Sequence, residues 1–503
     1  MNHDTRTSPN RNRKSPTESS RTEKFRRTAF RVVIFVYLAA ILVRLFRLYT
    51  FVYFWLDDFD NLYWVQQESG WEMAKNILNP ASHFFRPSAM LVYWINLQAF
   101  DLAPLPYHIL AWSLHGLNVA LIYFLLKRLL ESEYAAAFGA LLYTCPPFFF
   151  DIYWNFGTIF ELVSGALFFA GLLLYLRSGD TVRGILLVSA VYVLAVKAKE
   201  MAITLPVVCL WYELVLGKSV SSPVTVRDWL RTLLDFGQWK HVLKKLALPA
   251  CVALWFTCFK AAVLTTVSDP TDAYYTKFSI ITMGRGFGWY WNALSPIHLG
   301  WGGWAAIAVL AAGLLAVKNR LALFFLGYIF ISFVPVIFLP NHRFDFYWYL
   351  PLMGLCGLAG LVVKWASQRA NARMAPRWSI VAAGVVFVLA GELYFAYQKK
   401  VTADARNWAR YLSAEYRSFV LGLRALPPPP ANETVYYGSI PRYFDPDTIR
   451  SVTQVAFRRT DLEAKIVKEF PPEARYRVRF ENSSVILDRG SGGVDSAPVK
   501  SSP

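Results

Sequence analysis

Residues 51–64, FVYFWLDDFDNLYW, join a long apolar run to a cluster of three carboxylates. The apolar run, residues 30–50, has the length that a helix needs to cross a bilayer, which is about 20 residues. Asp57, Asp58 and Asp60 follow it directly. Carboxylates at a bilayer boundary are costly unless they face water, a cation or a substrate. The stretch therefore predicts a first membrane span whose end presents acidic groups for a function.

The composition extends this interpretation to the whole chain. Of its 503 residues, 55% are hydrophobic and only 17% are charged, whereas soluble proteins carry about 25% charged residues. We therefore expect an all-α polytopic membrane protein. The net charge of +18 lies mostly in short basic segments between apolar runs. Such segments set membrane topology and contact lipid phosphates, so we expect a lipid bilayer as partner and no nucleic acid.

The distribution of basic residues predicts the topology. We expect eleven spans, or up to thirteen if the segments 86–102 and 281–299 both cross fully. Eleven spans leave the basic loops on the side of the N-terminal tail and the acidic loops on the other side. The N-terminus is then cytoplasmic and the C-terminus extracytoplasmic. The expected spans are 30–50, 107–126, 134–152, 157–176, 184–200, 201–216, 246–266, 301–317, 321–339, 347–365 and 378–397.

Five regions follow from these patterns. We expect a disordered basic tail at 1–28, a transmembrane domain at 29–400, and a helix with a proline-rich linker at 401–431. A small extracytoplasmic α/β domain is expected at 432–489, with a hairpin turning at Asn482–Ser483, and a disordered tail at 490–503. Within the transmembrane domain, the mixed polarity of 61–80 and 86–102 favours interfacial helices beside the acids.

Several other polar residues stand in or beside apolar runs. His108 and His115 are seven residues apart, so they share a helix face with Asn118. They serve either a site or the packing between helices, and the packing role is favoured. Four further candidates carry charge. For Asp151, Lys199 and Glu200, a role at a helix end or in a local ion pair is an equally good explanation as a functional role. Glu161 favours function, because an intramembrane acid is costly. These candidates are Asp151, Glu161, Lys199 and Glu200.

Three motifs in this order make a resemblance. The acidic pair Asp57–Asp58, then FRPSAMLVYWIN from residue 85, then YHILAWSLHGLN from residue 107 resemble the GT-C superfamily of integral-membrane glycosyltransferases. The closer likeness is to the branch with protein O-mannosyltransferases and related bacterial enzymes. KAKEMAITLPVVCLWYEL (197–214) and HRFDFYWYLPLMGL (342–355) are similar to later stretches of such proteins. Phe346 stands where the pattern often has Arg.

The resemblance implies a GT-C-type enzyme of a bacterial inner membrane that acts in cell-envelope glycosylation. It would transfer a sugar from a polyprenyl-phosphate donor to an acceptor hydroxyl on the extracytoplasmic face, with inversion. Asp57 or Asp58 would serve as the base. The donor phosphate would be held by a cationic side chain. Candidates for the phosphate are Arg343, Arg86 and Lys199, and supporting candidates are Asp60, His108, His115, Asp151, Glu161, Glu200, His342 and Tyr347.

Other interpretations stay open at this point. A transporter or flippase of a lipid-linked sugar would also be polytopic, but it would place polar groups near the middle of the bilayer. Asp57 and Asp58 could also bind a divalent metal. The acceptor is a protein, a lipid or a glycan.

Overall fold

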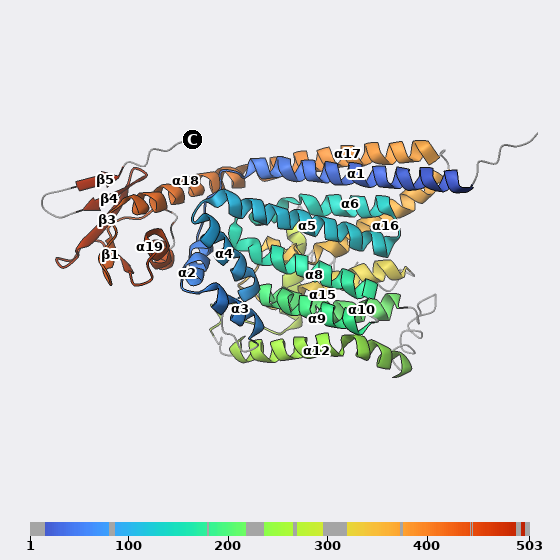
Figure 1. Cartoon of the computed structure of the whole chain (residues 1–503), viewed down its shortest axis with the longest axis horizontal. Coiled ribbons are helices and arrows are strands. Elements are labelled where there is room, and N and C mark those ends of the chain that lie inside the picture. Colours follow the sequence, from blue (N-terminus) through green and yellow to red (C-terminus); the bar gives the residue numbers. More distant parts are fainter. Residues whose placement is uncertain are drawn as a thin grey trace, which may run out of the picture.

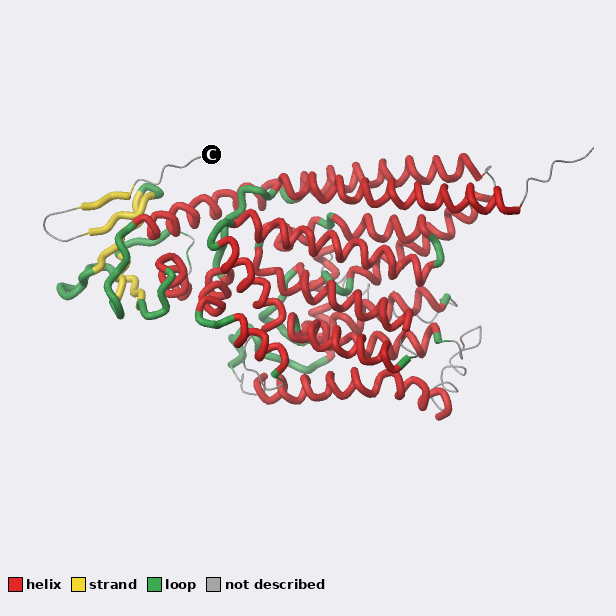
Figure 2. The backbone as a smooth tube through the Cα atoms, viewed as in Figure 1, coloured by secondary structure: helices red, strands yellow, loops and turns green. Residues whose placement is uncertain are grey.

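The computed structural model describes residues 16–79, 86–178, 181–217, 236–264, 269–294, 319–372, 376–442, 444, 446–488 and 494–497. The described chain is a bundle of long helices with a small sheet beyond one end (Figures 1 and 2). The first part of the predicted tail, most of the basic loop after residue 217 and the expected span 301–317 lie outside the described residues.

The bundle is built from helices that run roughly side by side (Figure 1). The first helix, α1, begins at Pro16, inside the tail that the sequence predicted to be disordered. The helices of the bundle are α1 (Pro16–Leu48), α5 (Pro104–Leu130), α6 (Glu133–Thr144), α8 (Ile159–Ser178), α9 (Val182–Ala198), α10 (Leu205–Leu216), α12 (Phe236–Leu264), α13 (Ile280–Leu294), α15 (Arg320–Ile337), α16 (Leu352–Asn371) and α17 (Pro376–Val401).

Five helices among the described residues are long and apolar enough to cross a membrane. They contain Thr28–Leu48, Pro104–Leu130, Phe156–Ser178, Arg320–Ile337 and Val381–Val401. A sixth candidate is the bent pair Glu133–Thr144 and Pro147–Trp154, which turns by 50°. Other bundle helices are shorter or carry more charge, as α9 and α10 show with 17 and 12 residues. The membrane class is thus supported, and the count of eleven spans stays a prediction.

Short helices follow the first span. They are α2 (Asp57–Gln66), α3 (Gly70–Leu78) and α4 (Pro87–Phe100). The 14 residues of α4 extend about 21 Å, which is less than the hydrocarbon thickness of about 30 Å. The α3 helix buries Met73 and exposes Trp71. Such an amphipathic helix suits the interfacial position expected for this region.

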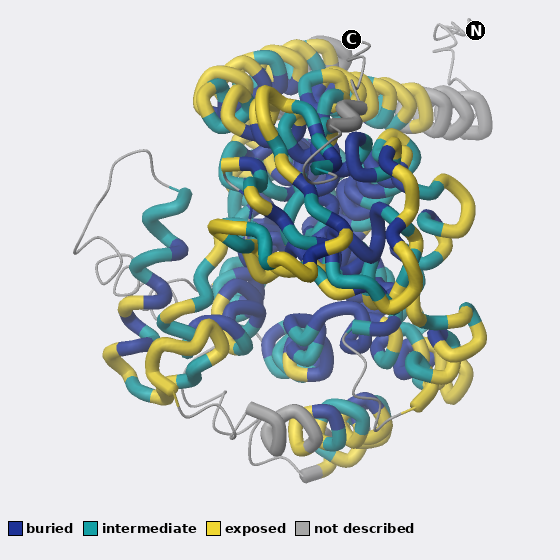
Figure 3. Tube along the Cα trace, turned by 90° about the vertical axis from the view of Figure 1, so that its left-hand side faces the viewer, coloured by how far each residue is buried: buried dark blue, intermediate teal, exposed yellow. Residues whose placement is uncertain are grey.

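Close approach of helices explains the packing of the bundle. At Gly139 in α6 a side chain would meet the backbone of Cys356 in α16 at 2.9 Å, and at Gly357 in α16 it would meet the ring of Phe325 at 2.3 Å. Membrane helices pack through such small residues because lipid supplies no hydrophobic drive between them. Buried residues fill the interior, and exposed ones lie mostly on the outer helices (Figure 3).

The C-terminal part begins as an extension of the last bundle helix. After α17, the helix α18 (Ala403–Ala425) leads away from the bundle to the sheet (Figure 1). The sheet has the strand order β2-β1-β3-β4-β5, and one helix, α19 (Ile449–Phe457), lies beside it. The strands are β1 (Thr434–Tyr437), β2 (Glu463–Ile466), β3 (Tyr476–Glu481), β4 (Ser484–Asp488) and β5 (Val494–Ala497).

The predicted hairpin of this domain is confirmed. Strands β3 and β4 pair antiparallel, and Asn482 and Ser483 between them have φ of 49° and 58°. Two positive φ values are what a tight two-residue hairpin turn requires. The sheet also continues beyond the end predicted at residue 489, because β5 pairs antiparallel with β4. The fifth described strand therefore lies beyond the predicted end of the domain.

Candidate active site

The backbone at Leu56 separates the two neighbouring acids. Leu56 precedes α2 and has φ of 37° and ψ of −111°, a conformation that is strained for a residue with a branched side chain. After this turn Asp57 is exposed and Asp58 is buried. The Asp58 carboxylate accepts hydrogen bonds from the Trp55 backbone N–H at 3.0 Å and from Tyr93 Oη at 2.8 Å. Asp58 is therefore fixed in place, and Asp57 is the acid that a substrate can reach.

The surroundings of Asp58 change its protonation. Burial raises the pKa of its carboxyl to about 7, and the charge of Asp57 acts in the same direction. The hydrogen bonds from Trp55 and Tyr93 oppose this rise. Burial dominates because removing a charge from water disfavours the ionised form. Near neutral pH, the Asp58 carboxyl is therefore close to its protonation midpoint.

A second group of charges lies at the same end of the bundle. Arg86, the residue before α4, pairs with Glu200 at 3.0 Å. Lys199, the residue after α9, pairs with Glu161 at 2.6 Å. The side chains of Lys199 and Glu161 are only 7% and 3% exposed. Buried charges need partners of this kind, because an unpaired one costs several kcal/mol, on the order of 3–5. We call Arg86, Glu161, Lys199 and Glu200 the charge cluster.

Aromatic residues and a histidine border the charge cluster. The Lys199 ammonium lies 5.3 Å from the ring centre of Tyr347 and 5.7 Å from that of Phe346. The His342 ring lies 4.6 Å from the ring of Tyr274. Lys199 therefore brings a positive charge beside these two rings.

The electrostatics at His342 show which sign the charge cluster presents. Burial lowers the pKa of His342 to about 4. The charges of Lys199 and Arg86 each lower it further, and each acts more strongly than Glu200, which raises it. At His342 the two basic residues of the charge cluster therefore act more strongly than its carboxylate Glu200. This balance favours an anion on this side.

Tyr274 is influenced by the charges of Asp57 and of the charge cluster. It lies in the loop before α13, which Asn341 holds through hydrogen bonds to the carbonyls of Pro270 and Asp272. Burial raises the pKa of Tyr274. The charge of Arg86 lowers it, and those of Glu200 and Asp57 raise it. Tyr274 thus lies within electrostatic range of both Asp57 and Arg86.

Other predicted residues have different partners. Arg343 is electrostatically coupled to Tyr290 and Arg285. Asp345 follows nearby, and burial together with the charge of Asp151 raises its pKa to about 6. Asp151 itself accepts a hydrogen bond from Trp154 Nε1 at 3.1 Å.

The two histidines of α5 take part in helix packing. His115 donates through Nε2 to the Thr144 carbonyl at 3.0 Å, which leaves Nδ1 to accept from Tyr349 Oη at 3.0 Å. Asn118 donates to the Leu162 carbonyl at 2.9 Å. His108 is buried near Phe156. Asp60 is half-buried on the first turn of α2.

Metal binding receives no support from the described part of the chain. No group of three or more His, Cys, Asp or Glu side chains is arranged there to hold a metal ion. Of the pair considered for a metal, Asp57 is exposed, whereas Asp58 is occupied by Trp55 and Tyr93.

Two residues of this region were not predicted from the sequence. Tyr93 lies within an apolar stretch, and its one signal is a hydroxyl that must find a partner when buried. Tyr274 lies in the loop DPTDAYYTKF (269–278), whose position depends on contacts with Asn341. Neither pairing is local in sequence, so no spacing rule points to it.

Comparisons with known proteins bear on the fold. No protein-family model and no curated protein matches the sequence. The structure is similar to ArnT from Cupriavidus metallidurans in the apo state, with a TM-score of 0.51 and 13% identity over 88% of this chain and 86% of that chain. ArnT bound to undecaprenyl phosphate gives a TM-score of 0.48 at 15% identity over 86% of both chains. The apo Archaeoglobus fulgidus oligosaccharyltransferase gives 0.47 at 13% identity over 88% of this chain and 65% of that chain. At 13% identity, the likeness to apo ArnT concerns the fold alone.

Proposed function

We propose that this chain is a membrane glycosyltransferase of GT-C type. It transfers a sugar from a polyprenyl-phosphate donor to an acceptor hydroxyl on the extracytoplasmic face, with inversion. Two observations support this proposal. The first is the fold that the chain shares with ArnT, a protein also solved with undecaprenyl phosphate. The second is the candidate active site. The observation that carries the proposal is that Tyr274 lies within electrostatic range of both the exposed Asp57 and Arg86.

The reaction assigns Asp57 the role of base. The acceptor oxygen attacks the anomeric carbon while the bond from that carbon to the phosphate oxygen breaks. Asp57 takes the proton of the attacking hydroxyl, and the phosphate leaves with the electron pair of the broken bond. A base in this role contributes about 10²–10⁴-fold to the rate. Exposure suits Asp57 for this step, whereas Asp58 is buried.

The departing phosphate is assigned to Arg86 and Lys199. Both are held by carboxylates before any substrate arrives, so their positions are set in advance. Prearranged charges stabilise developing negative charge without a cost of reorganisation at the moment of reaction. The balance of charges at His342 marks the side on which we place the phosphate. Arg343 stays a further candidate, because it follows His342 directly.

The positions of the charges favour an enzyme over a transporter. Arg86 precedes α4, Lys199 follows α9 and Asp57 begins α2, so all three stand at helix ends. A transporter is expected to place its polar site near the middle of its helices. We propose that this end of the bundle is extracytoplasmic, that the N-terminus is cytoplasmic, and that the membrane is a bacterial inner membrane.

The test is transfer by the purified protein. The protein in nanodiscs is incubated with radiolabelled polyprenyl-phosphate sugars and with membrane extract as the source of acceptors. We expect one sugar to transfer and Asp57→Asn to slow the transfer by about 10²–10⁴-fold. Asp404→Asn, an exposed acid at the start of α18, is the matched control. Transport of intact lipid-linked sugar across the bilayer without transfer would refute the proposal.

A further inference from the structure

The C-terminal part of the chain contacts the acid-bearing helix along its whole length. Before its first residue, Trp55 packs edge-on against Trp408 of α18, with ring centres 5.5 Å apart. Within its first turn, Phe59 stacks on Tyr416 of α18 at 6.2 Å. At its last residue, Gln66 donates to the Gln454 carbonyl of α19 at 3.3 Å. Three contacts in succession therefore fix the helix α2 from one side.

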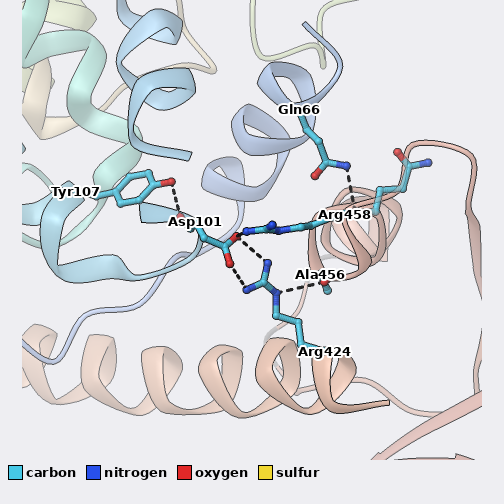
Figure 4. Close-up of polar contacts among 7 residues, drawn as sticks. Gln66, Asp101, Tyr107, Arg424, Ala456 and Arg458 are labelled. Atoms are coloured by element: carbon cyan, nitrogen blue, oxygen red, sulfur yellow. Dashed lines mark hydrogen bonds and ion pairs between the residues drawn. The ribbon is translucent and has the colours of Figure 1, made fainter. Parts of the chain in front are cut away.

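Charge pairs anchor the same part of the chain beside α2 (Figure 4). Arg424 of α18 binds both carboxylate oxygens of Asp101, at 2.6 and 2.8 Å. Arg458 of α19 reaches the same carboxylate at 2.8 Å. Burial opposes ionisation of Asp101, but the hydrogen bonds from the two arginines outweigh it and lower the pKa of this carboxyl. Asp101 directly follows α4, and α4 carries Tyr93, the partner of Asp58.

The contacts hold α2 from two sides. Tyr93 of α4 binds Asp58. The helix α18 contacts Phe59, and α19 contacts Gln66. Leu56 has a strained backbone, and such strain of about 1–3 kcal/mol persists only where the surroundings impose it. Trp408 touches the residue directly before Leu56. Loosening α18 would let this turn relax, and the relaxation would move Asp57.

We propose that Trp408 and Arg424 are positioning residues for the transfer reaction. They act through α2 and Leu56 on the position of Asp57, so the C-terminal domain contributes to the site. This inference rests on the proposed function of Asp57. A displacement of about 1 Å at a reacting group can cost about 10²-fold in rate. We therefore expect Arg424→Ala and Trp408→Ala each to lower kcat for transfer by about 10–100-fold and to leave the KM for the donor unchanged.

Two measurements test this on the full-length protein in nanodiscs. The first is the transfer rate of Arg424→Ala in the wild-type and in the Asp57→Asn background. A positioning residue costs activity only while Asp57 is present, so the second background should show no further loss. The second is hydrogen–deuterium exchange of residues 57–66, which we expect to quicken in Arg424→Ala and Trp408→Ala.

Matched variants guard against general damage. Arg450→Ala breaks an exposed ion pair with Glu463, of 3.0 Å, in the same domain and should change neither measurement. Trp408→Phe keeps an aromatic ring against Trp55 and should restore most of the activity. Equal losses in both Asp57 backgrounds, or full transfer despite faster exchange, would overturn the inference. If the wild-type protein transfers no sugar, the proposed function fails. Separately, unchanged exchange of residues 57–66 in Arg424→Ala and Trp408→Ala would show that these two residues do not fix α2.

Discussion

Replacing Asp58 by Asn should remove a defined part of the pH dependence of stability. The pKa of this carboxyl is about 7 in the folded protein, against an ordinary value of 3.8. Between these two pH values the folded chain binds one proton more than the unfolded chain. Stability therefore falls as pH rises, by about 1.4 kcal/mol for each pH unit. The total is about 4 kcal/mol, fully present below pH 3.8 and lost once pH has risen through about 7.

The assay is thermal unfolding of the purified protein in detergent between pH 4.5 and 8.5. Other carboxyls titrate in this range, Asp345 among them, so the measured quantity is the difference between wild type and Asp58→Asn. This difference should shrink by several kcal/mol up to pH 7 and stay constant above it. Asp57→Asn is the control, because removing its charge lowers the pKa of Asp58 and shifts the fall to lower pH without abolishing it. Parallel pH curves for wild type and Asp58→Asn would refute the reasoning.

Three further outcomes are expected. Lys199→Met should weaken donor binding at least tenfold, as measured by retention of labelled donor. Arg343→Ala should weaken it less, because Arg343 lies outside the charge cluster. The reverse order would assign the phosphate to Arg343. Glu161→Gln should destabilise the protein by about 3–5 kcal/mol in thermal unfolding, because it leaves the Lys199 ammonium buried beside a neutral group; an unchanged melting temperature would contradict this. A cysteine at residue 480 should react with a membrane-impermeant maleimide added outside intact cells, and labelling only after lysis would reverse the predicted topology.

The sequence predicted the features that are written locally. Apolar length indicated the membrane spans, and the turn at Asn482–Ser483 followed from alternation on both sides of it. The acids after the first span were recognised because carboxylates are unusual there. Each of these conclusions needs only a short window of sequence.

The arrangement of the site needed the structure. The sequence does not show which of Asp57 and Asp58 is exposed, because exposure depends on the backbone turn at Leu56. Arg86 and Glu200 are 114 residues apart, and no spacing rule predicts their pairing. The role of Trp408 was also hidden, since an aromatic residue in an amphipathic helix is usually explained by packing alone. Long-range pairs of this kind are decided by tertiary packing.

The distance in sequence between α2 and its partners has a consequence for synthesis of the protein. Gln66 and Gln454 are 388 residues apart. At about 5–20 residues per second, the ribosome needs roughly 20–80 s to pass from one to the other. During this interval the bundle can insert into the membrane, but α2 has not yet formed its contacts with α18 and α19. A chain that stops before residue 403 lacks the contacts of α18 and α19 with this region, so under our proposal its transfer reaction is slower than that of the full chain.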